Sequence, residues 1–353
     1  MRRAQQGETG LAGRLALVRA AHLNAYIAAL RDIGAPVERD LARSQLPTRI
    51  EETPDSYVSI PLALEWIART GHDLEPMEIG LLGAQKASVT SLRPAHRTVI
   101  AAAQTGLRRL EALAAQARFE DSALDIRIRH EAGQTRVLCD MAGFARHPFM
   151  CLAEWLNLQA VVSIVRSVAG AQWCPPELCF TATNRLPQAV CAAFPDARIL
   201  MGQAHTSVLV SSADLARPAH AASAPARATV ASTTAGGGRP APDSWPFPVL
   251  LRELIAPYLM DGRPDVAFAA EVAGISTRTL QRRLMQNGSS YSQVLQEARF
   301  ATACTRLADP AMKVIDVAMM MGYDSPQHFT RAFRRYTGLT PTQYRQQGIA
   351  GAV

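Results

Sequence analysis

The sequence lacks any uninterrupted apolar run approaching the roughly 20 residues that a membrane-spanning helix needs. Its first residues, Met-Arg-Arg-Ala-Gln-Gln-Gly-Glu, are not followed by the apolar core of a signal peptide. We therefore expect a cytoplasmic protein with no membrane-embedded part. Of its 353 residues 48% are hydrophobic, so the chain can form two or three domains with cores, and disorder throughout is excluded.

Cysteine is too sparse and too irregularly spaced for a zinc site. Cys174 and Cys179 are five residues apart, but no second pair completes a tetrahedral set of ligands. We expect reduced and mostly buried thiols, and a redox switch that uses these two cysteines stays open as an alternative. The six cysteines are Cys139, Cys151, Cys174, Cys179, Cys191 and Cys304.

Catalytic signatures are also lacking. The sequence has no Gly-rich phosphate loop and no His-Glu-x-x-His helix. Cys151 and Glu154 fall on neighbouring positions of a predicted helix with His147 just before it, but no further ligand follows at a recognisable spacing, so we expect capping or core roles. We predict that the chain is not an enzyme and needs no cofactor. An enzyme fused to a regulator would require convergent titratable groups in an N-terminal cleft.

The net charge of +7 is unevenly distributed. Residues 244–353 contain 12 Lys and Arg against 8 Asp and Glu, whereas residues 1–216 contain 22 against 21. A basic C-terminal part suits a polyanionic partner, and the nearly neutral N-terminal part does not require one.

The most informative stretch runs from Pro326 to Arg345. Phe329 and Phe333 are four residues apart, so they share the buried face of a helix. Gly338 provides a helix stop, and Pro341 can open the next helix. The other side of the helix carries donors for phosphates and base edges, namely Gln327, His328, Arg331, Arg334 and Arg335.

This stretch is the second half of an internal repeat. The residues Ala270, Gly274, Ser276, Leu280 and Leu284 recur as Ala318, Gly322, Ser325, Phe329 and Phe333. Each copy predicts a helix, a tight turn at glycine and a second helix, as in a helix-turn-helix. Ser276 and Ser325 are expected to cap the second helices and leave their first amides towards phosphate. A helix from Tyr291 to Asp309 is predicted between the copies, long enough to hold two recognition helices about one DNA turn apart.

The closing pattern resembles the DNA-binding domain of the AraC/XylS family of bacterial transcription regulators. That pattern has Pro, two residues, Phe, x, Arg, x, Phe and Arg or Lys, followed by Gly, x, Ser or Thr, Pro and Tyr-Arg, and every position is filled here. In the first copy Thr277, Arg278, Gln281 and Arg282 lie outward, and the resemblance places the last three at positions that meet bases or adjacent phosphates. Their equivalents in the second copy are Gln327, His328 and Arg331, while Thr330 and Arg335 are interpreted as contacts to the DNA backbone.

The segment from Arg217 to Pro242 is rich in Pro, Gly, Ser and Ala and has no aromatic residue, so it predicts a flexible linker. Before it, helical spacing from Leu15 to Leu30 predicts an opening helix. Alternation over Leu124–Ile128 and Val137–Cys139 predicts a β-hairpin. Further helices are predicted over 62–67, 79–82, 99–113, 149–168 and 186–194, with strands over 177–181 and 206–211.

This order of elements resembles the arabinose-binding-like effector domain of one branch of the family, whose members are associated with diverse effectors. The resulting fold class is an α+β N-terminal effector domain joined by a flexible linker to an all-α C-terminal domain with two helix-turn-helix motifs. The predicted parts are a tail over 1–12, an effector and dimerisation domain over 13–216, the linker over 217–243 and the DNA-binding domain over 244–348.

We therefore expect a cytoplasmic, sequence-specific regulator that activates transcription. Its expected partners are double-stranded promoter DNA, RNA polymerase, a small-molecule effector of unknown identity and a second copy in a homodimer. No metal is expected. The alternatives are a regulator of the same class that has no effector, and one controlled by thiol oxidation.

Overall fold

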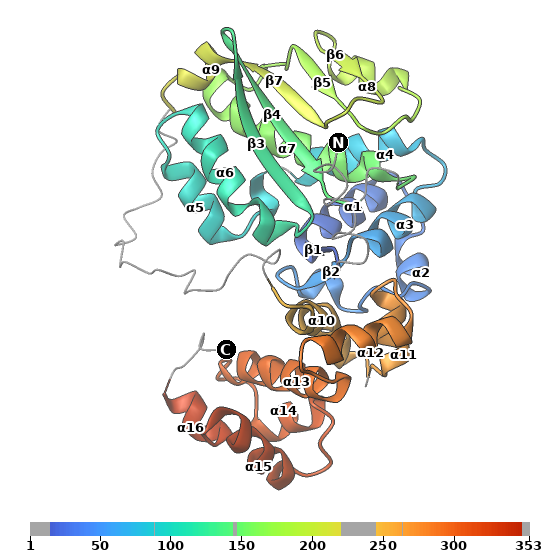
Figure 1. The fold of residues 1–353 in the computed structure, drawn as a ribbon, viewed down its shortest axis with the longest axis vertical. Helices are drawn as coiled ribbons and strands as arrows, with labels where there is room; N and C mark the ends of the chain where they lie inside the picture. The colour runs from blue at the N-terminus through green and yellow to red at the C-terminus, as the bar shows by residue number, and fades with distance from the viewer. Residues whose placement is uncertain (1–14, 88, 144–146, 220–244, 263, 348–353) are drawn as a thin grey trace. The chain divides into compact units, whose positions relative to one another are not determined.

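The structure is a computed structural model, and it describes residues 15–87, 89–143, 147–219, 245–262 and 264–347 (Figure 1). The chain divides into two compact units. Unit 1 comprises Met1–Ser44 with Ile60–Ser244, and unit 2 comprises Gln45–Ser59 with Trp245–Val353. The predicted tail and residues 220–243 of the predicted linker lie outside the described residues.

Unit 1 is an α+β domain, as the sequence predicted. Its strands are β1 (Leu17–Arg19), β3 (Leu124–Glu131), β4 (Gln134–Met141), β5 (Glu177–Cys179), β6 (Arg198–Leu200) and β7 (Ser207–Ser211). Its helices are α1 (Ala20–Asp32), α2 (Val37–Ala42), α3 (Ile60–Thr70), α4 (Pro76–Ala87), the 3-10 turn η2 (Val89–Ser91), α5 (Pro94–Ala102), α6 (Gly106–Glu120), α7 (Met150–Ala169), α8 (Gln188–Ala193) and α9 (Ser212–Ala216).

The sheet of unit 1 has the order β3-β4-β7-β5-β6. Strands β3 and β4 form the predicted hairpin, with Leu124 opposite Met141 and Glu131 opposite Gln134. Gly133 closes the turn with a φ of 74°, a left-handed conformation that glycine adopts without a steric penalty. The parallel pair of β5 and β6 was not predicted, because β6 has only three residues and its apolar pair, Ile199 and Leu200, shows no alternation.

Helix α7 is the central element of unit 1, because it packs against β4 and β7 as well as against α4 and α6. Its hydrophobic residues occur all around the helix, which is typical of a helix covered on every side. Trp155 on α7 lies 4.9 Å from the ring of Phe180 and 5.6 Å from that of Phe194, measured between centroids. These rings join α7 to the segments that flank β5 and α8.

The predicted opening helix over 15–30 is wrong at its start. Residues Leu17–Arg19 form strand β1, and α1 begins only at Ala20. The amide of Leu17 donates to Ser122 Oγ at 2.8 Å, and the amide of Ser122 donates to the carbonyl of Leu17 at 2.9 Å. These bonds to a segment more than 100 residues away hold an extended backbone that local spacing does not reveal.

The predicted helical stretch over 99–113 is divided into α5 and α6. Helix α5 ends at Ala102, and Thr105 caps α6 by accepting a hydrogen bond from the amide of Arg108 at 3.3 Å. Threonine at this position offers the backbone an alternative to continuing the helix. The amide of Ala219 donates to the carbonyl of Gln104 at 2.8 Å, so the end of the described part of unit 1 lies beside this break.

The C-terminal part of unit 2 is all helical. Its helices are α10 (Phe247–Ile255), the 3-10 segment η4 (Ala256–Met260), α11 (Val266–Val272), α12 (Thr277–Gln286), α13 (Tyr291–Leu307), α14 (Val314–Met320), α15 (Pro326–Thr337) and α16 (Pro341–Gln346). Phe300, Phe329, Phe333 and Tyr344 are in the core formed by α13 to α16.

Unit 2 also contains a short segment from early in the sequence, with η1 (Ile50–Glu52) and β2 (Tyr57–Ser59). The ring of Tyr57 meets that of Trp245 edge to face, with centroids 5.8 Å apart. The amide of Thr48 donates to Asp261 Oδ2 at 3.1 Å. These contacts place a segment from the first sixth of the chain in the same compact unit as α10.

Candidate nucleic-acid interface

Helices α11 and α12 form the first of the two predicted helix pairs. Asp265 caps α11 by accepting from the amide of Phe268 at 2.8 Å. Gly274, with a φ of 66°, makes the turn, and the amide of Ile275 returns to the carbonyl of Ala270 at 3.0 Å. Ser276 Oγ accepts from the amide of Thr279 at 3.2 Å, so the predicted cap of α12 is confirmed.

Helix α12 separates a buried side from a polar side. Leu280 and Leu284 are completely or almost completely buried, as predicted. Among the described residues, no hydrogen-bond or ion-pair partner occurs for the side chains of Arg278, Gln281 and Arg282. Spacings of three and four residues place these three groups on one side of the helix. Ser276, Arg278, Gln281 and Arg282 are exposed and Thr277 is half-buried.

Arg283 follows directly after this exposed row and has a different role. Its guanidinium lies over the ring of Phe247, 5.5 Å from the centroid, and the residue is half-buried. A guanidinium over an aromatic face is attracted by the negative face of the ring. Arg283 thereby joins α12 to α10, a contact that sequence spacing did not predict because Phe247 lies 36 residues earlier.

Helices α14 and α15 form the second pair, with Gly322 at a φ of 77° between them. The expected cap by Ser325 is not formed. Ser325 is at the N-cap position of α15, but its hydroxyl donates to Gln327 Oε1 at 2.6 Å and accepts no backbone amide. The Ser325 hydroxyl thus pairs with a side chain of the first turn of α15 and not with a backbone amide.

Helix α15 also has two distinct sides. Phe329 and Phe333 are completely buried, with ring centroids 5.5 Å apart, which confirms the predicted core face. Gly338 ends the helix with a φ of 80°, and Pro341 is the first residue of α16, both as predicted. The predicted contact residues Gln327, His328, Arg331 and Arg335 are exposed, as is Arg334, while Ser325 and Thr330 are half-buried.

Helix α13 connects the two pairs. Ser290 and Gln293 form a reciprocal capping box at its start. Its 17 residues end at Leu307, two residues before the predicted end at Asp309. Asp309 precedes Pro310, and the residue before a proline avoids the helical conformation. At 1.5 Å per residue the helix is about 25 Å long.

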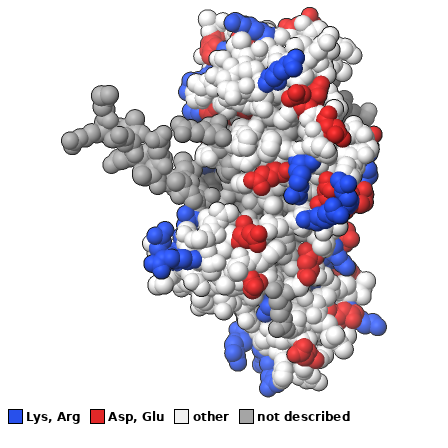
Figure 2. Space-filling view, turned by 90° about the vertical axis from the view of Figure 1, so that its right-hand side faces the viewer, with Lys and Arg blue, Asp and Glu red and all other residues white. Residues whose placement is uncertain are grey.

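Figure 2 shows Lys and Arg side chains spread over the visible face, with Asp and Glu side chains among them. Exposed cations on both α12 and α15 contribute to this distribution. Exposed arginines such as those of α12 and α15 attract phosphate groups, and the attraction weakens as salt concentration rises.

The surroundings of Cys151 and Glu154 indicate structural roles for both side chains. The carboxylate of Glu154 is fully buried and accepts from the amide of Thr181 at 2.6 Å and from its hydroxyl at 2.7 Å. Burial, with the nearby charge of Glu154, raises the pKa of the Cys151 thiol to about 12, which disfavours a reactive thiolate. Across the described ranges, no group of three His, Cys, Asp or Glu residues is placed to hold a metal ion.

Two family models match the chain. The helix-turn-helix domain model matches residues 269–347, and the model of the arabinose-binding domain of AraC transcription regulators, N-terminal, matches residues 34–219. No helix in the described part of the chain is long and apolar enough to cross a membrane.

Curated relatives match to different extents. The ornithine utilization regulator of Pseudomonas aeruginosa is 35% identical over 83 residues, which is 24% of each chain. The transcriptional regulator VirS of Mycobacterium tuberculosis is 23% identical over 334 residues, or 94% of this chain and 97% of VirS. The chain thus spans about a quarter of the first relative and nearly all of the second.

Among solved structures, the transcriptional regulator CdpR of Pseudomonas aeruginosa is 22% identical with a TM-score of 0.43, over 92% of this chain and 96% of CdpR. The arabinose-binding domain model alone covers more than half of the 353 residues. The chain belongs to the AraC family of transcription regulators.

Proposed function

We propose that this regulator binds specific promoter sequences through α12 and α15, acts as an activator with RNA polymerase in the cytoplasm, and responds to a small molecule bound by unit 1. The observation that carries the proposal is the exposed row of Arg278, Gln281 and Arg282 on α12, whose side chains have no partner in the described part of the chain. Arginine pairs with guanine through two hydrogen bonds, and glutamine pairs with adenine in the same way.

The first turn of α12 supports this assignment. Ser276 satisfies the amide of Thr279, so other amides of the first turn remain available to a phosphate oxygen. Thr277 and Arg278 lie at this end of the helix, where a recognition helix contacts base edges. We assign Arg278, Gln281 and Arg282 to bases or the phosphates beside them, and Ser276 and Thr277 to the backbone.

The second helix pair, α14 and α15, presents a different set of exposed groups. On α15 three of the exposed residues are arginines, namely Arg331, Arg334 and Arg335, and the amide oxygen of Gln327 accepts from the Ser325 hydroxyl. Its amide group, His328 and Arg331 are assigned to base edges, while Ser325, Thr330 and Arg335 are assigned to the phosphate backbone, which fixes the register. A homodimer would bind two half-sites, each with two successive major grooves.

Control by a small molecule requires that the effector favour one state of the protein over another. The rival control by thiol oxidation has little support from Cys179, which is buried. Burial raises the pKa of its thiol, and a protonated thiol is a poor nucleophile. Serine substitutions at Cys174 and Cys179 that leave every promoter response unchanged would exclude this rival.

The decisive experiment is genome-wide DNA binding of the native protein beside an Arg278→Ala/Gln281→Ala variant. Gln286→Ala, at the far end of the same helix, and Arg129→Ala, on β3 of unit 1, are the controls, because both side chains are exposed. We expect sharp peaks with a shared motif that vanish only in the double variant. Unchanged peaks in the double variant would show that α12 does not contact bases through these two residues.

A further inference from the structure

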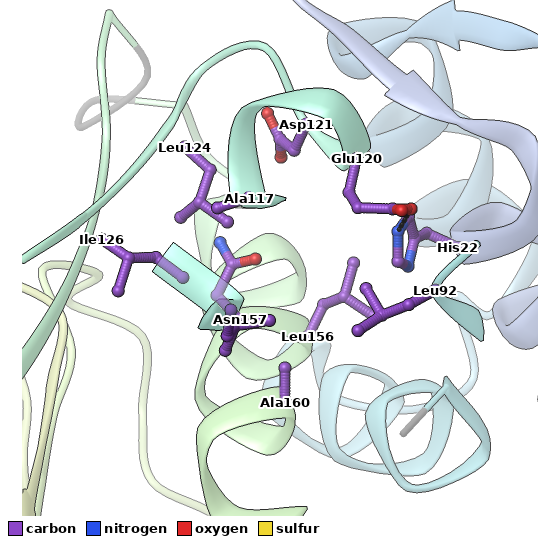
Figure 3. Close-up of a pocket in the computed structure, with 11 residues that line it drawn as sticks. His22, Leu92, Ala117, Glu120, Asp121, Leu124, Ile126, Leu156, Asn157 and Ala160 are labelled. Carbon is purple, nitrogen blue, oxygen red and sulfur yellow. Dashed lines mark hydrogen bonds and ion pairs between the residues drawn. The ribbon is translucent and has the colours of Figure 1, made fainter. Parts of the chain in front are cut away.

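Unit 1 contains an apolar cavity between α1, α6, α7 and β3 (Figure 3). Its walls are largely aliphatic, and Leu113, Leu156 and Ile126 are among them. A second cavity lies on the other side of His22, Asp121 and Leu156, which line both. Each has a volume of about 30 Å³, enough for about two water molecules.

Two buried polar side chains on the wall of the first cavity have unsatisfied atoms. His22 is 8% exposed and Asn157 is 5% exposed. Within the described residues, neither Nδ1 of His22 nor Nδ2 of Asn157 has a hydrogen-bond partner. In Figure 3, Asn157 projects from α7 towards Ala117 on α6. Buried polar atoms are normally paired, so both atoms point to a bound group that pairs with them.

Glu120 engages one ring nitrogen of His22 and leaves the other to the cavity. Its carboxylate lies beside Arg19, and its Oε2 is 3.1 Å from His22 Nε2. Its Oε1 accepts from the amide of Arg93 at 3.1 Å and lies 2.6 Å from His96 Nδ1. Both carboxylate oxygens of Glu120 therefore already have partners within the protein.

Burial alone would raise the pKa of Glu120, but hydrogen bonds from His22 and His96 and the charges of His22 and Arg19 hold it well below its usual range. The carboxylate therefore stays ionised and accepts the proton on His22 Nε2. The other ring nitrogen, Nδ1, accepts a hydrogen bond when the imidazole is neutral and donates one when it is charged, and a hydroxyl group can pair with it in either form. Asn157 Nδ2 supplies a donor on the same wall.

We infer that this cavity is the effector site of unit 1, and that its ligand is a compact, uncharged and mainly apolar molecule with one hydroxyl and one carbonyl oxygen or their equivalents. The hydroxyl would pair with His22 Nδ1, and the other oxygen would accept from Asn157 Nδ2. The inference rests on the proposed control of the regulator by a small molecule.

The same wall disfavours sugars and carboxylates. A free sugar carries a hydroxyl on nearly every carbon, and aliphatic walls would leave most of them unpaired. An anion would meet the ionised carboxylate of Glu120. Similarity to an arabinose-binding domain therefore does not extend to the chemistry of this cavity.

Ligand entry would change the protein. A typical ligand pocket measures about 300–1,000 Å³, so even a compact molecule must separate the side chains around a cavity of about 30 Å³. Displacing Leu156 or His22 would join the two cavities, because both residues line each of them. Ligand binding would thus select a state in which α1, α6 and α7 are spread apart.

The test is saturation-transfer NMR and calorimetry on the full-length chain with 2-hydroxycyclohexanone, hexanoate and L-arabinose as probes. Asn157→Leu removes the donor and fills part of the cavity, and it should fold because it also removes an unpaired buried group. Gln188→Leu, at an exposed position on α8, is the control. We expect saturable binding of 2-hydroxycyclohexanone that weakens at least tenfold in Asn157→Leu only, with no binding of the other probes.

Equal binding to Asn157→Leu and the native chain would overturn the assignment, as would binding of arabinose or hexanoate that Asn157→Leu abolishes. No saturable binding of 2-hydroxycyclohexanone, with only ordered water beside Asn157 in a crystal structure, would also overturn it. If α12-dependent DNA binding persists in that case, only the cavity inference fails. If 2-hydroxycyclohexanone binds but never alters promoter occupancy, the cavity is a ligand site and the proposed control fails.

Discussion

Arg345 Nε donates to the carbonyl oxygen of Leu307 at 3.1 Å, which joins α16 to the last residue of α13. A second nitrogen of the same guanidinium donates to the carbonyl of Met312. Helix ends leave carbonyls without intrahelical partners, and this arginine satisfies one of them. The Tyr-Arg pair that closes the family pattern is thus structural here, since the ring of Tyr344 also packs 5.6 Å from that of Phe333.

Replacing Arg345 should destabilise unit 2. Arg345→Ala leaves two carbonyls unpaired, and we expect a loss of about 1–3 kcal/mol in the free energy of unfolding. Urea unfolding followed by fluorescence measures this loss, with the exposed Gln346→Ala as the control. Equal midpoints for Arg345→Ala and the native chain would contradict a structural role.

Replacing Arg278 should relax specificity at one base pair in each half-site. If its guanidinium forms two hydrogen bonds to a guanine, Arg278→Ala loses about 1–3 kcal/mol of discrimination against the wrong base. Competition binding against operators with single-base changes gives this quantity. A uniform loss across all operators would instead assign Arg278 to a phosphate.

Replacing Arg335 should weaken DNA binding equally for all sequences. Arg335 is exposed near the end of α15, and we assign it to a phosphate. Arg335→Ala should reduce the slope of log affinity against log salt by about 1. Fluorescence anisotropy at several salt concentrations measures the slope, and a change in base preference would argue for a base contact.

Asp121 should make unit 1 less stable as pH rises. Burial outweighs the hydrogen bonds from the Ala123 and Leu124 amides and raises its pKa from 3.8 to about 7. The folded state therefore holds this proton more tightly than the unfolded state, and that stabilisation is lost between about pH 4 and pH 7.

Asp121→Asn removes this ionisation. As the pH rises from 5 to 8, the free energy of unfolding of the variant should therefore increase by about 1 kcal/mol or more relative to that of the native chain. Urea unfolding at both pH values measures the gain, which must exceed that of the exposed Asp196→Asn. The comparison isolates Asp121 from Glu120, whose lowered pKa stabilises the fold above its usual titration range and loses that effect on acidification. If the free energies of unfolding of Asp121→Asn and the native chain differ by the same amount at pH 5 and at pH 8, the pKa of Asp121 is not raised in the folded protein.

Local signals explain which elements were predictable from sequence. The α15 face, the stop at Gly338 and the β3–β4 hairpin follow from spacing and turn residues within a few positions of each other. Strand β1 was not predictable because Ser122, more than 100 residues away, holds it. The repeat pattern also did not reveal that the Ser325 hydroxyl pairs with the Gln327 side chain and not with a backbone amide.

The two candidate sites also differ in whether local sequence patterns reveal them. The DNA-facing groups Arg278, Gln281 and Arg282 occur within one helix, so its periodicity places them on one side. The cavity in unit 1 needs His22, Glu120 and Asn157, which come from three helices spread over 136 residues of sequence. No local pattern connects them, and only the packing of α1, α6 and α7 brings them together.

The uninterrupted helix α13 has a consequence for how such a protein can change. Each residue added to a helix turns everything beyond it by about 100° and advances it by 1.5 Å. A single insertion between Tyr291 and Leu307 would therefore rotate α15 relative to α12. Under the proposed mode of binding, the length of α13 fixes the spacing and the relative rotation of the two DNA segments that α12 and α15 contact. The base sequence of an operator can therefore diverge more easily than the spacing between these two segments.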